Sequence, residues 1–240
     1  MANPYFSFKQ FTVYHDRCAM KVGIDGVLLG AWANVENTGR ILDIGTGSGL
    51  IALMLAQRST SDIDAIDIDA NAVLQASVNI TSSPWGHRVN VQEISLQDFA
   101  KTTTRKYDLI VSNPPYFINS FKSPTDNRTF ARHTVSLSHE ELILNAKNML
   151  HPTGRICIIL PVIEAEQCEV FATSHGLYCN REVRVIPKPN GEVKRLMMEF
   201  GSQPCLKEIT ELIIESDERH CYSEEFTALA KDFYLNPSCS

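Results

Sequence analysis

Arg40-Ile41-Leu42-Asp43-Ile44-Gly45-Thr46-Gly47-Ser48-Gly49 is the stretch that decides the fold of this chain. Its apolar first half predicts a buried strand, and the segment from Leu50 to Gln57 that follows predicts a helix. Glycines between a strand and a helix let the backbone approach a ligand, and the N-terminus of the helix faces that ligand. Alone, this pattern is a weak signal that a dinucleotide site would also produce.

The carboxylate of Asp43 favours one kind of ligand over another. An acid two residues before the first glycine would repel a pyrophosphate, whereas a cationic ammonium or sulfonium ligand would tolerate it. We therefore assign Asp43, Gly45, Gly47 and Gly49 to a cofactor site and disfavour a dehydrogenase that uses the glycine loop for a dinucleotide.

A second strand is expected at residues 64–68, with Asp67 near its carboxyl end. An acid in this place accepts hydrogen bonds from ribose hydroxyls. Asp69 is interpreted as the cap of a helix over residues 72–80. A third strand at residues 88–94 precedes a short turn in which Leu96 and Phe99 are candidates to flank an adenine ring.

The fourth strand, residues 107–112, ends in Asn113-Pro114-Pro115-Tyr116. Proline cannot donate to a strand ladder, and Pro114 favours extended geometry at Asn113. The side-chain oxygen of Asn113 and the carbonyl of Pro114 are acceptors for the two hydrogens of a planar NH2 group, and Tyr116 offers a ring for stacking. A plain strand-ending turn is the alternative. The motif contains no nucleophile, metal ligand or obvious base.

The remaining pattern completes an α/β chain in which these motifs fall at one sheet edge. The expected elements are an N-terminal hairpin, a helix capped by Asp25, helices at 138–150 and 164–175, a strand at 154–160, a hairpin of 177–187 with 192–201, an edge strand at 210–215 and a helix at 223–234. We expect a Rossmann-like, seven-stranded, mostly parallel sheet with a terminal antiparallel hairpin and helices on both faces. The expected units are a cap at 1–36, a core at 37–203 and an acidic strand and helix at 204–240.

Composition limits the partners and the compartment. The net charge is −6, and most of it lies in residues 207–240, so basic patches elsewhere remain available for phosphate binding. The seven cysteines form no C-x-x-C pair, which suggests reduced thiols, no structural metal and a cytoplasmic protein. We expect no secretory signal and no membrane span.

The motifs at Asp43 to Gly49, at Asp67 and at Asn113 to Tyr116 resemble class I S-adenosylmethionine-dependent methyltransferases of the amino-methylating branch, over most of residues 40–200. Three further stretches are similar to the bacterial valine-tRNA adenine-N6 methyltransferases: residues 11–32, Ala131-Arg132-His133 leading to Leu137-Ser138, and residues 222–235. Two positions depart from that family. Ile24 stands where threonine is expected, and Ser95 stands where such enzymes often carry an acid near the cofactor's adenine.

The resemblance implies methyl transfer from S-adenosyl-L-methionine to N6 of adenine 37, in the anticodon loop of a valine tRNA. It implies catalytic roles for Asn113, Pro114 and Tyr116, and cofactor contacts that include Lys21 and Leu96. Residues 117–138 are expected to form a long substrate-gripping loop, whose candidate RNA contacts are Lys122, Arg128, Arg132 and His133.

Other readings stay open for this site. Guanine N2 in ribosomal RNA and a glutamine amide in a protein also suit the Asn113 motif, and a catalytically inactive RNA-binding module belongs to a different class. The expected partner is tRNA, without membrane or metal, and a monomer is favoured.

Overall fold

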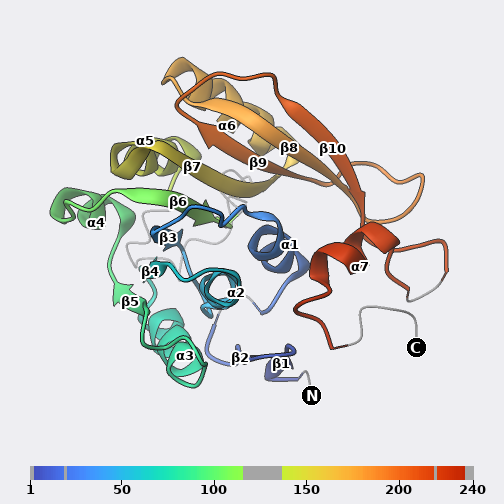
Figure 1. The fold of residues 1–240 in the computed structure, drawn as a ribbon, viewed down its shortest axis with the longest axis horizontal. Coiled ribbons are helices and arrows are strands. Elements are labelled where there is room, and N and C mark those ends of the chain that lie inside the picture. Colours follow the sequence, from blue (N-terminus) through green and yellow to red (C-terminus); the bar gives the residue numbers. More distant parts are fainter. Residues whose placement is uncertain (1–2, 19–20, 116–136, 219–220, 236–240) are drawn as a thin grey trace, which may run out of the picture.

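The computed structural model describes residues 3–18, 21–115, 137–218 and 221–235 of the 240-residue chain. Its centre is an eight-stranded sheet with the strand order β10-β8-β9-β7-β6-β3-β4-β5 (Figure 1). The strands are β3 (Arg40–Ile44), β4 (Asp62–Asp67), β5 (Val89–Glu93), β6 (Tyr107–Ser112), β7 (Leu150–Pro161), β8 (Tyr178–Ile186), β9 (Arg195–Gly201) and β10 (Glu208–Ile213). Of these, β9 alone runs antiparallel to its neighbours β7 and β8.

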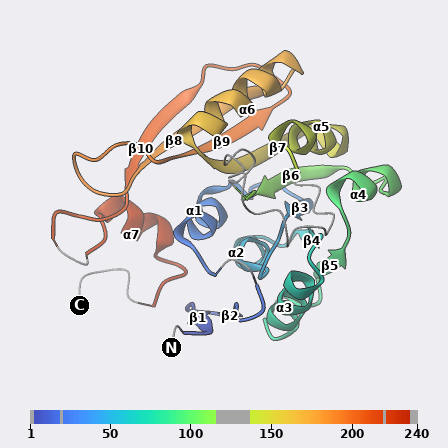
Figure 2. The same cartoon turned by 180° about the vertical axis from the view of Figure 1, so that it is seen from behind.

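Helices cover both faces of the sheet. They are α1 (Ile24–Trp32), α2 (Leu50–Arg58), α3 (Ala70–Thr81), α4 (Leu96–Thr102), α5 (His139–Met149), α6 (Val162–Ser174) and α7 (Glu224–Ala230). One hydrophobic cluster joins the sheet to α1, α2, α3 and α7, and a second joins it to α4, α5 and α6. Figure 2 shows α5 and α6 on the opposite side of the sheet from α1 and α2. The expected Rossmann-like class is therefore confirmed, but the sheet has eight strands rather than the expected seven, because β10 pairs with β8 at its edge.

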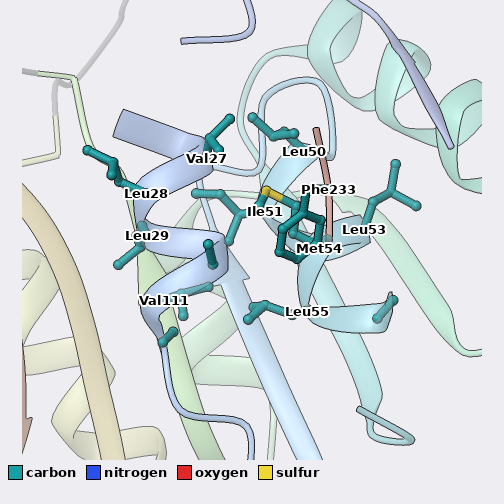
Figure 3. Close-up of a cluster of buried hydrophobic side chains, with 14 of the residues drawn as sticks. Val27, Leu28, Leu29, Leu50, Ile51, Leu53, Met54, Leu55, Val111 and Phe233 are labelled. Carbon is teal, nitrogen blue, oxygen red and sulfur yellow. The ribbon is translucent and has the colours of Figure 1, made fainter. Parts of the chain in front are cut away.

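The closest helix contact lies between α1 and α2, and it depends on a glycine. A Cβ atom placed at Gly30 would lie 2.8 Å from the sulfur of Met54, so a larger residue would push the helices apart. Figure 3 shows this cluster, in which Met54 of α2 meets Phe233 from the C-terminal segment. Residues expected to belong to the core and to the C-terminal unit thus pack in one cluster.

The expected N-terminal hairpin is present as β1 (Tyr5–Ser7) and β2 (Thr12–Tyr14), which pair in antiparallel fashion. It lies beside α3 (Figure 1) and also contacts the C-terminal segment, where the backbone N–H of Lys9 donates to the carbonyl of Phe233 at 2.8 Å. The hairpin is therefore held in place by contacts with α3 and with the C-terminal segment.

Helix starts show where local sequence signals succeed and fail. Asp69 caps α3 by accepting from the backbone N–H of Asn71, as the sequence predicts. Ser138 forms a capping box with Glu141 at the start of α5. The expected cap at Asp25 is wrong, because α1 begins at Ile24 after an extended Gly23. Asp25 instead lies 3.0 Å from the guanidinium of Arg195.

The cysteines require one correction. Five cysteines of the described part are free thiols, namely Cys18, Cys157, Cys168, Cys179 and Cys205. Cys221 is disulfide-bonded, so the expectation of reduced thiols throughout is wrong at this position. Among the described residues, no helix has both the length and the apolar character needed to cross a bilayer.

Candidate functional site

The glycine loop between β3 and α2 has a backbone that only glycine adopts easily. Gly45, Gly47 and Gly49 have φ angles of 71°, 56° and 82°, all in the left-handed region. A Cβ atom at Gly45 or Gly47 would meet nothing within 4 Å, whereas one at Gly49 would lie 3.3 Å from Ala76. The first two glycines therefore border open space, where a ligand can approach the backbone, and the third packs against α3.

Asp43 is fully buried beneath this loop and is only partly satisfied. Its Oδ2 accepts from the hydroxyl of Thr46 at 2.7 Å and from the backbone N–H of Ala52 at 3.2 Å. Its Oδ1 is buried and has no hydrogen-bond partner among the described residues. Burial raises the pKa of Asp43 to about 7, although the bonds from Thr46 and Ala52 act in the opposite direction. An orphaned carboxylate oxygen beside an open loop fits a ligand with a cationic or N–H group.

Asp67, at the carboxyl end of β4, joins the glycine loop to the next strand. Its Oδ2 accepts from the backbone N–H of Gly47 at 2.8 Å, and its Oδ1 accepts from the backbone N–H of Asp69 at 3.0 Å. A carboxylate has about four lone-pair sites, so it can still accept from ribose hydroxyls. Asp67 therefore supports the loop as well as offering acceptors to a ligand.

Asn113 lies beside the glycine loop because β3 and β6 are neighbouring parallel strands. Ile44 pairs with Ser112, and the hydroxyl of Ser112 donates to the carbonyl of Ile44 at 2.9 Å. Gly45 and Asn113 are thus the next residues on strands that are about 5 Å apart. Asn113 is half-buried and Pro114 is buried. The two motifs that were far apart in the sequence therefore meet at one edge of the sheet.

Several expected site residues lie elsewhere or outside the described part. Tyr116, Lys122, Arg128, Arg132 and His133 fall outside the described residues, so their roles stay predictions.

Lys21 is described and exposed, and its cofactor contact also stays a prediction. Leu96 and Phe99 are buried in the cluster beneath α4 and α5, at 4% and 5% exposure, and lie in a helix rather than the expected turn. An adenine contact by the Leu96 side chain therefore remains untested.

The structure places an acid next to Ser95, where the family motif departs. Ser95 caps α4, accepting from the backbone N–H of Asp98 at 3.1 Å and donating to its carboxylate at 2.8 Å. The spacing Ser95-x-x-Asp98 is a capping signal that the sequence already contained.

Two buried side-chain amides near the glycine loop were not predicted from the sequence to take part in the site. Gln75 and Asn79 of α3 are 3% and 1% exposed. They stand four residues apart within the stripe that α3 buries, which also contains Ala72, Ala76 and Ile80. Polar residues inside an apolar helical stripe were the signal that could have revealed them.

One group of possible metal ligands lies away from this edge. Glu169, Cys179 and Glu182 place one ligand atom each within 4.8 Å of one another. The ammonium of Lys207 already lies 2.9 Å from Glu169 and 2.5 Å from Glu182, so a cation is present there. Burial also raises the pKa of the Cys179 thiol to about 12. This group is an ion-pair network within the part of the chain that the structure describes.

Comparison with known proteins identifies the class of the site. Residues 24–169 match the family described as methyltransferase small domain. The tRNA1(Val) (adenine(37)-N6)-methyltransferase of Parabacteroides distasonis is 54% identical over 235 residues, covering 98% of this chain and 99% of that protein. A protein of the same name from Trichodesmium erythraeum is 47% identical, with 98% and 99% coverage. The chain belongs to this methyltransferase family.

Membership in the family confirms the resemblance and excludes the alternative of a dehydrogenase.

Solved structures add support for the fold alone. A predicted O-methyltransferase, protein Atu636 of Agrobacterium tumefaciens, has a TM-score of 0.68 at 15% identity and covers 90% of this chain and 98% of its own. TrmN from Thermus thermophilus has a TM-score of 0.55 at 20% identity, covering 74% of this chain and 48% of its own.

Proposed function

We propose that this chain transfers a methyl group from S-adenosyl-L-methionine to N6 of adenine 37 in a valine tRNA. The observation that carries the proposal is the register of β3 and β6, which puts Asn113 beside the glycine loop. A group that holds an amine and a cradle for a cofactor then share one site. The near-full-length relatives named for this reaction support the choice of substrate.

The residues of the loop suit the cofactor. S-Adenosyl-L-methionine supplies an electrophilic methyl group on a sulfonium when it is bound. Asp43 provides the unsatisfied buried acceptor, Gly45 and Gly47 provide open backbone, and Asp67 provides acceptors for the ribose hydroxyls. Lys21 and Leu96 complete the proposed set of cofactor contacts.

Asn113 and Pro114 orient the amine that reacts. Their oxygens accept the two N6 hydrogens, which localises the nitrogen lone pair toward the methyl group, and Tyr116 stacks on the adenine ring. With the cofactor bound, N6 would take its methyl carbon, S-adenosylhomocysteine would leave with the electron pair of the broken carbon–sulfur bond, and the N6 proton would pass to water, because the motif contains no obvious base. Catalysis thus comes from position and electrostatics rather than from a covalent intermediate. A single-stranded anticodon loop suits this scheme because its bases leave the stack at low cost.

The proposed RNA contacts come from two segments. Lys122, Arg128, Arg132 and His133 follow the Asn113 motif in sequence. Arg17 and Lys21, in the N-terminal segment, are exposed in the described part. By contrast, Lys188, Lys194 and Arg195 are each paired with an acid at 3.2, 2.7 and 3.0 Å. We propose the cytoplasm, where tRNA is found, as the compartment.

Methylation of tRNA by the purified protein tests this proposal. The protein is incubated with radiolabelled S-adenosyl-L-methionine and total tRNA, and the labelled nucleosides are identified. We expect N6-methyladenosine, and no label in a valine tRNA transcript whose adenine 37 is replaced by guanine. Label in N2-methylguanosine, in protein, or in neither would contradict the proposal.

A further inference from the structure

The N-terminal segment after β2 is attached to α3 by side-chain amides. Asn79 accepts from the backbone N–H of Tyr14 at 3.0 Å and donates to the carbonyl of Tyr14 at 2.8 Å. Gln75, one helical turn earlier, accepts from the backbone N–H of Arg17 at 3.2 Å. These amides bind the backbone of the segment as a neighbouring strand would.

The same asparagine also holds the glycine loop. The second N–H of Asn79 donates to the carbonyl of Ser48 at 2.8 Å, between Gly47 and Gly49. Asn79 is 1% exposed, and both of its donors and its acceptor oxygen are used. One buried side chain therefore links the N-terminal segment directly to the cofactor loop.

The segment runs antiparallel to α3 and ends beside the ribose-binding acid. Tyr14 meets Asn79 and Arg17 meets Gln75, so the chain moves toward the N-terminus of α3, which follows Asp67 and Asp69. Cys18 comes next and is half-buried. Burial raises the pKa of the Cys18 thiol to about 11, and the negative charges of Asp67, Asp69 and Asp16 act in the same direction.

We propose that residues 14–18 form a wall of the cofactor pocket beside Asp67, and that Asn79 is a positioning residue that holds this wall in register with the glycine loop. The choice of ligand rests on the function proposed above. The clamp itself rests only on the hydrogen bonds of Asn79 and Gln75.

Alkylation of Cys18 measures the clamp without any ligand. The full chain is labelled with iodoacetamide, and mass spectrometry then measures the modified fraction of the peptide that contains Cys18. We expect slow labelling in the wild type and labelling at least about tenfold faster in Asn79→Ala, because the loss of these hydrogen bonds leaves buried partners unsatisfied and favours the open state of the segment. S-Adenosylhomocysteine should slow the labelling of the wild type.

Calorimetric titration with S-adenosylhomocysteine measures the consequence for binding. Asn79→Ala should raise the dissociation constant by about tenfold. Ser61→Ala is the matched control. Ser61 is also buried, and its hydroxyl donates to the carbonyl of Thr38. It lies just before β4, at the opposite end of that strand from Asp67. The substitution should lower stability without changing affinity. Gln75→Ala removes only the bond to Arg17 and serves if Asn79→Ala does not fold.

Different outcomes separate the two proposals. The wall is wrong if the ligand binds the wild type but neither protects Cys18 nor binds more weakly to Asn79→Ala. The clamp is wrong if Asn79→Ala and Gln75→Ala both leave the labelling rate of Cys18 unchanged. A wild type that binds no S-adenosylhomocysteine overturns the proposed function, and the cofactor part of this inference with it.

Discussion

Two buried aspartates on neighbouring strands of the sheet have opposite surroundings. Asp64 of β4 accepts from the guanidinium of Arg105 at 2.8 and 3.1 Å, from the hydroxyl of Tyr107 at 2.7 Å and from the amide of Asn90 at 3.1 Å. Asp43 of β3 has two donors, both on one oxygen, and its other oxygen has none.

We infer from this difference that Asp64 is a structural carboxylate, and we propose that Asp43 faces a ligand. Removing a partner from a buried charge that is surrounded by donors and a cation destabilises the folded state. A buried oxygen without a partner is costly, and proteins rarely retain one without a reason. We propose that a ligand in the open loop above Asp43 supplies the missing partner, whereas the described donors already use the acceptor sites of Asp64.

The largest effect should come from Asn113, on the ligand-binding side of this comparison. Asn113→Ala removes the acceptor that orients the amine, and turnover should fall by about 10²–10³-fold, by analogy with the loss of one oxyanion-hole donor. Steady-state methylation of valine tRNA measures the change, and cofactor affinity is measured in parallel.

The matched control is Asn90→Ala, which removes an amide that donates to Asp64. Turnover should stay near the wild-type value while stability falls. Near wild-type turnover of Asn113→Ala would show that this residue does not orient the amine.

Asp67→Ala should weaken cofactor binding next most strongly. The change removes the proposed acceptors for two ribose hydroxyls and also the bond from the backbone N–H of Gly47 that supports the loop. Charge-assisted bonds are worth about 1.5–3 kcal/mol each before non-additivity, so the dissociation constant should rise by about 10²-fold. Calorimetry with S-adenosylhomocysteine gives the value, and an unchanged constant would remove Asp67 from the site.

Tyr107→Phe tests the structural side of the comparison. It deletes the hydroxyl that donates to Asp64 and keeps the buried ring. The free energy of unfolding should fall by about 1.5–3 kcal/mol, and cofactor affinity should not change. Chemical denaturation and calorimetry on the same preparation provide both numbers. A loss of affinity without a loss of stability would reverse the roles assigned to the two regions.

The last prediction concerns the pH dependence of stability without ligand, where the change per pH unit is small. Folding raises the pKa of Asp43 to about 7, above the value of about 3.9 for an exposed aspartate. Between these values the folded state keeps a proton that the unfolded state has lost, so this group makes stability fall as pH rises from about 4 toward 7. The slope is at most about 1.4 kcal/mol per pH unit. Asp43→Asn should flatten the profile, and identical profiles would show that Asp43 is not the group responsible.

The sequence predicted that the site motifs share one edge of the sheet, because each motif marks the end of a strand. Strands ending before Gly45 and Asn113 are short apolar runs, and parallel strands in alternation with helices bring those ends together. The helix cap at Asp69 was readable for a similar local reason.

Contacts between distant segments were not readable. The bonds from Asn79 to Tyr14 and Ser48 join three parts of the chain, and no local pattern specifies such a junction. The pairing of Asp25 with Arg195 likewise replaced a plausible cap, because the partner comes from β9. The disulfide at Cys221 also escaped prediction, since an odd count of cysteines does not show which of them pair.

Hydrogen exchange with and without S-adenosylhomocysteine compares both regions in one measurement. The account predicts slower exchange of the backbone amides in residues 45–49 and 67–69, where the glycine loop and Asp67 meet the ligand. Residues 102–107, beside Asp64, should exchange at the same rate in both samples. Unchanged exchange at 45–49, or protection confined to 102–107, would contradict the assignment of the cofactor site to the unsatisfied edge at Asp43.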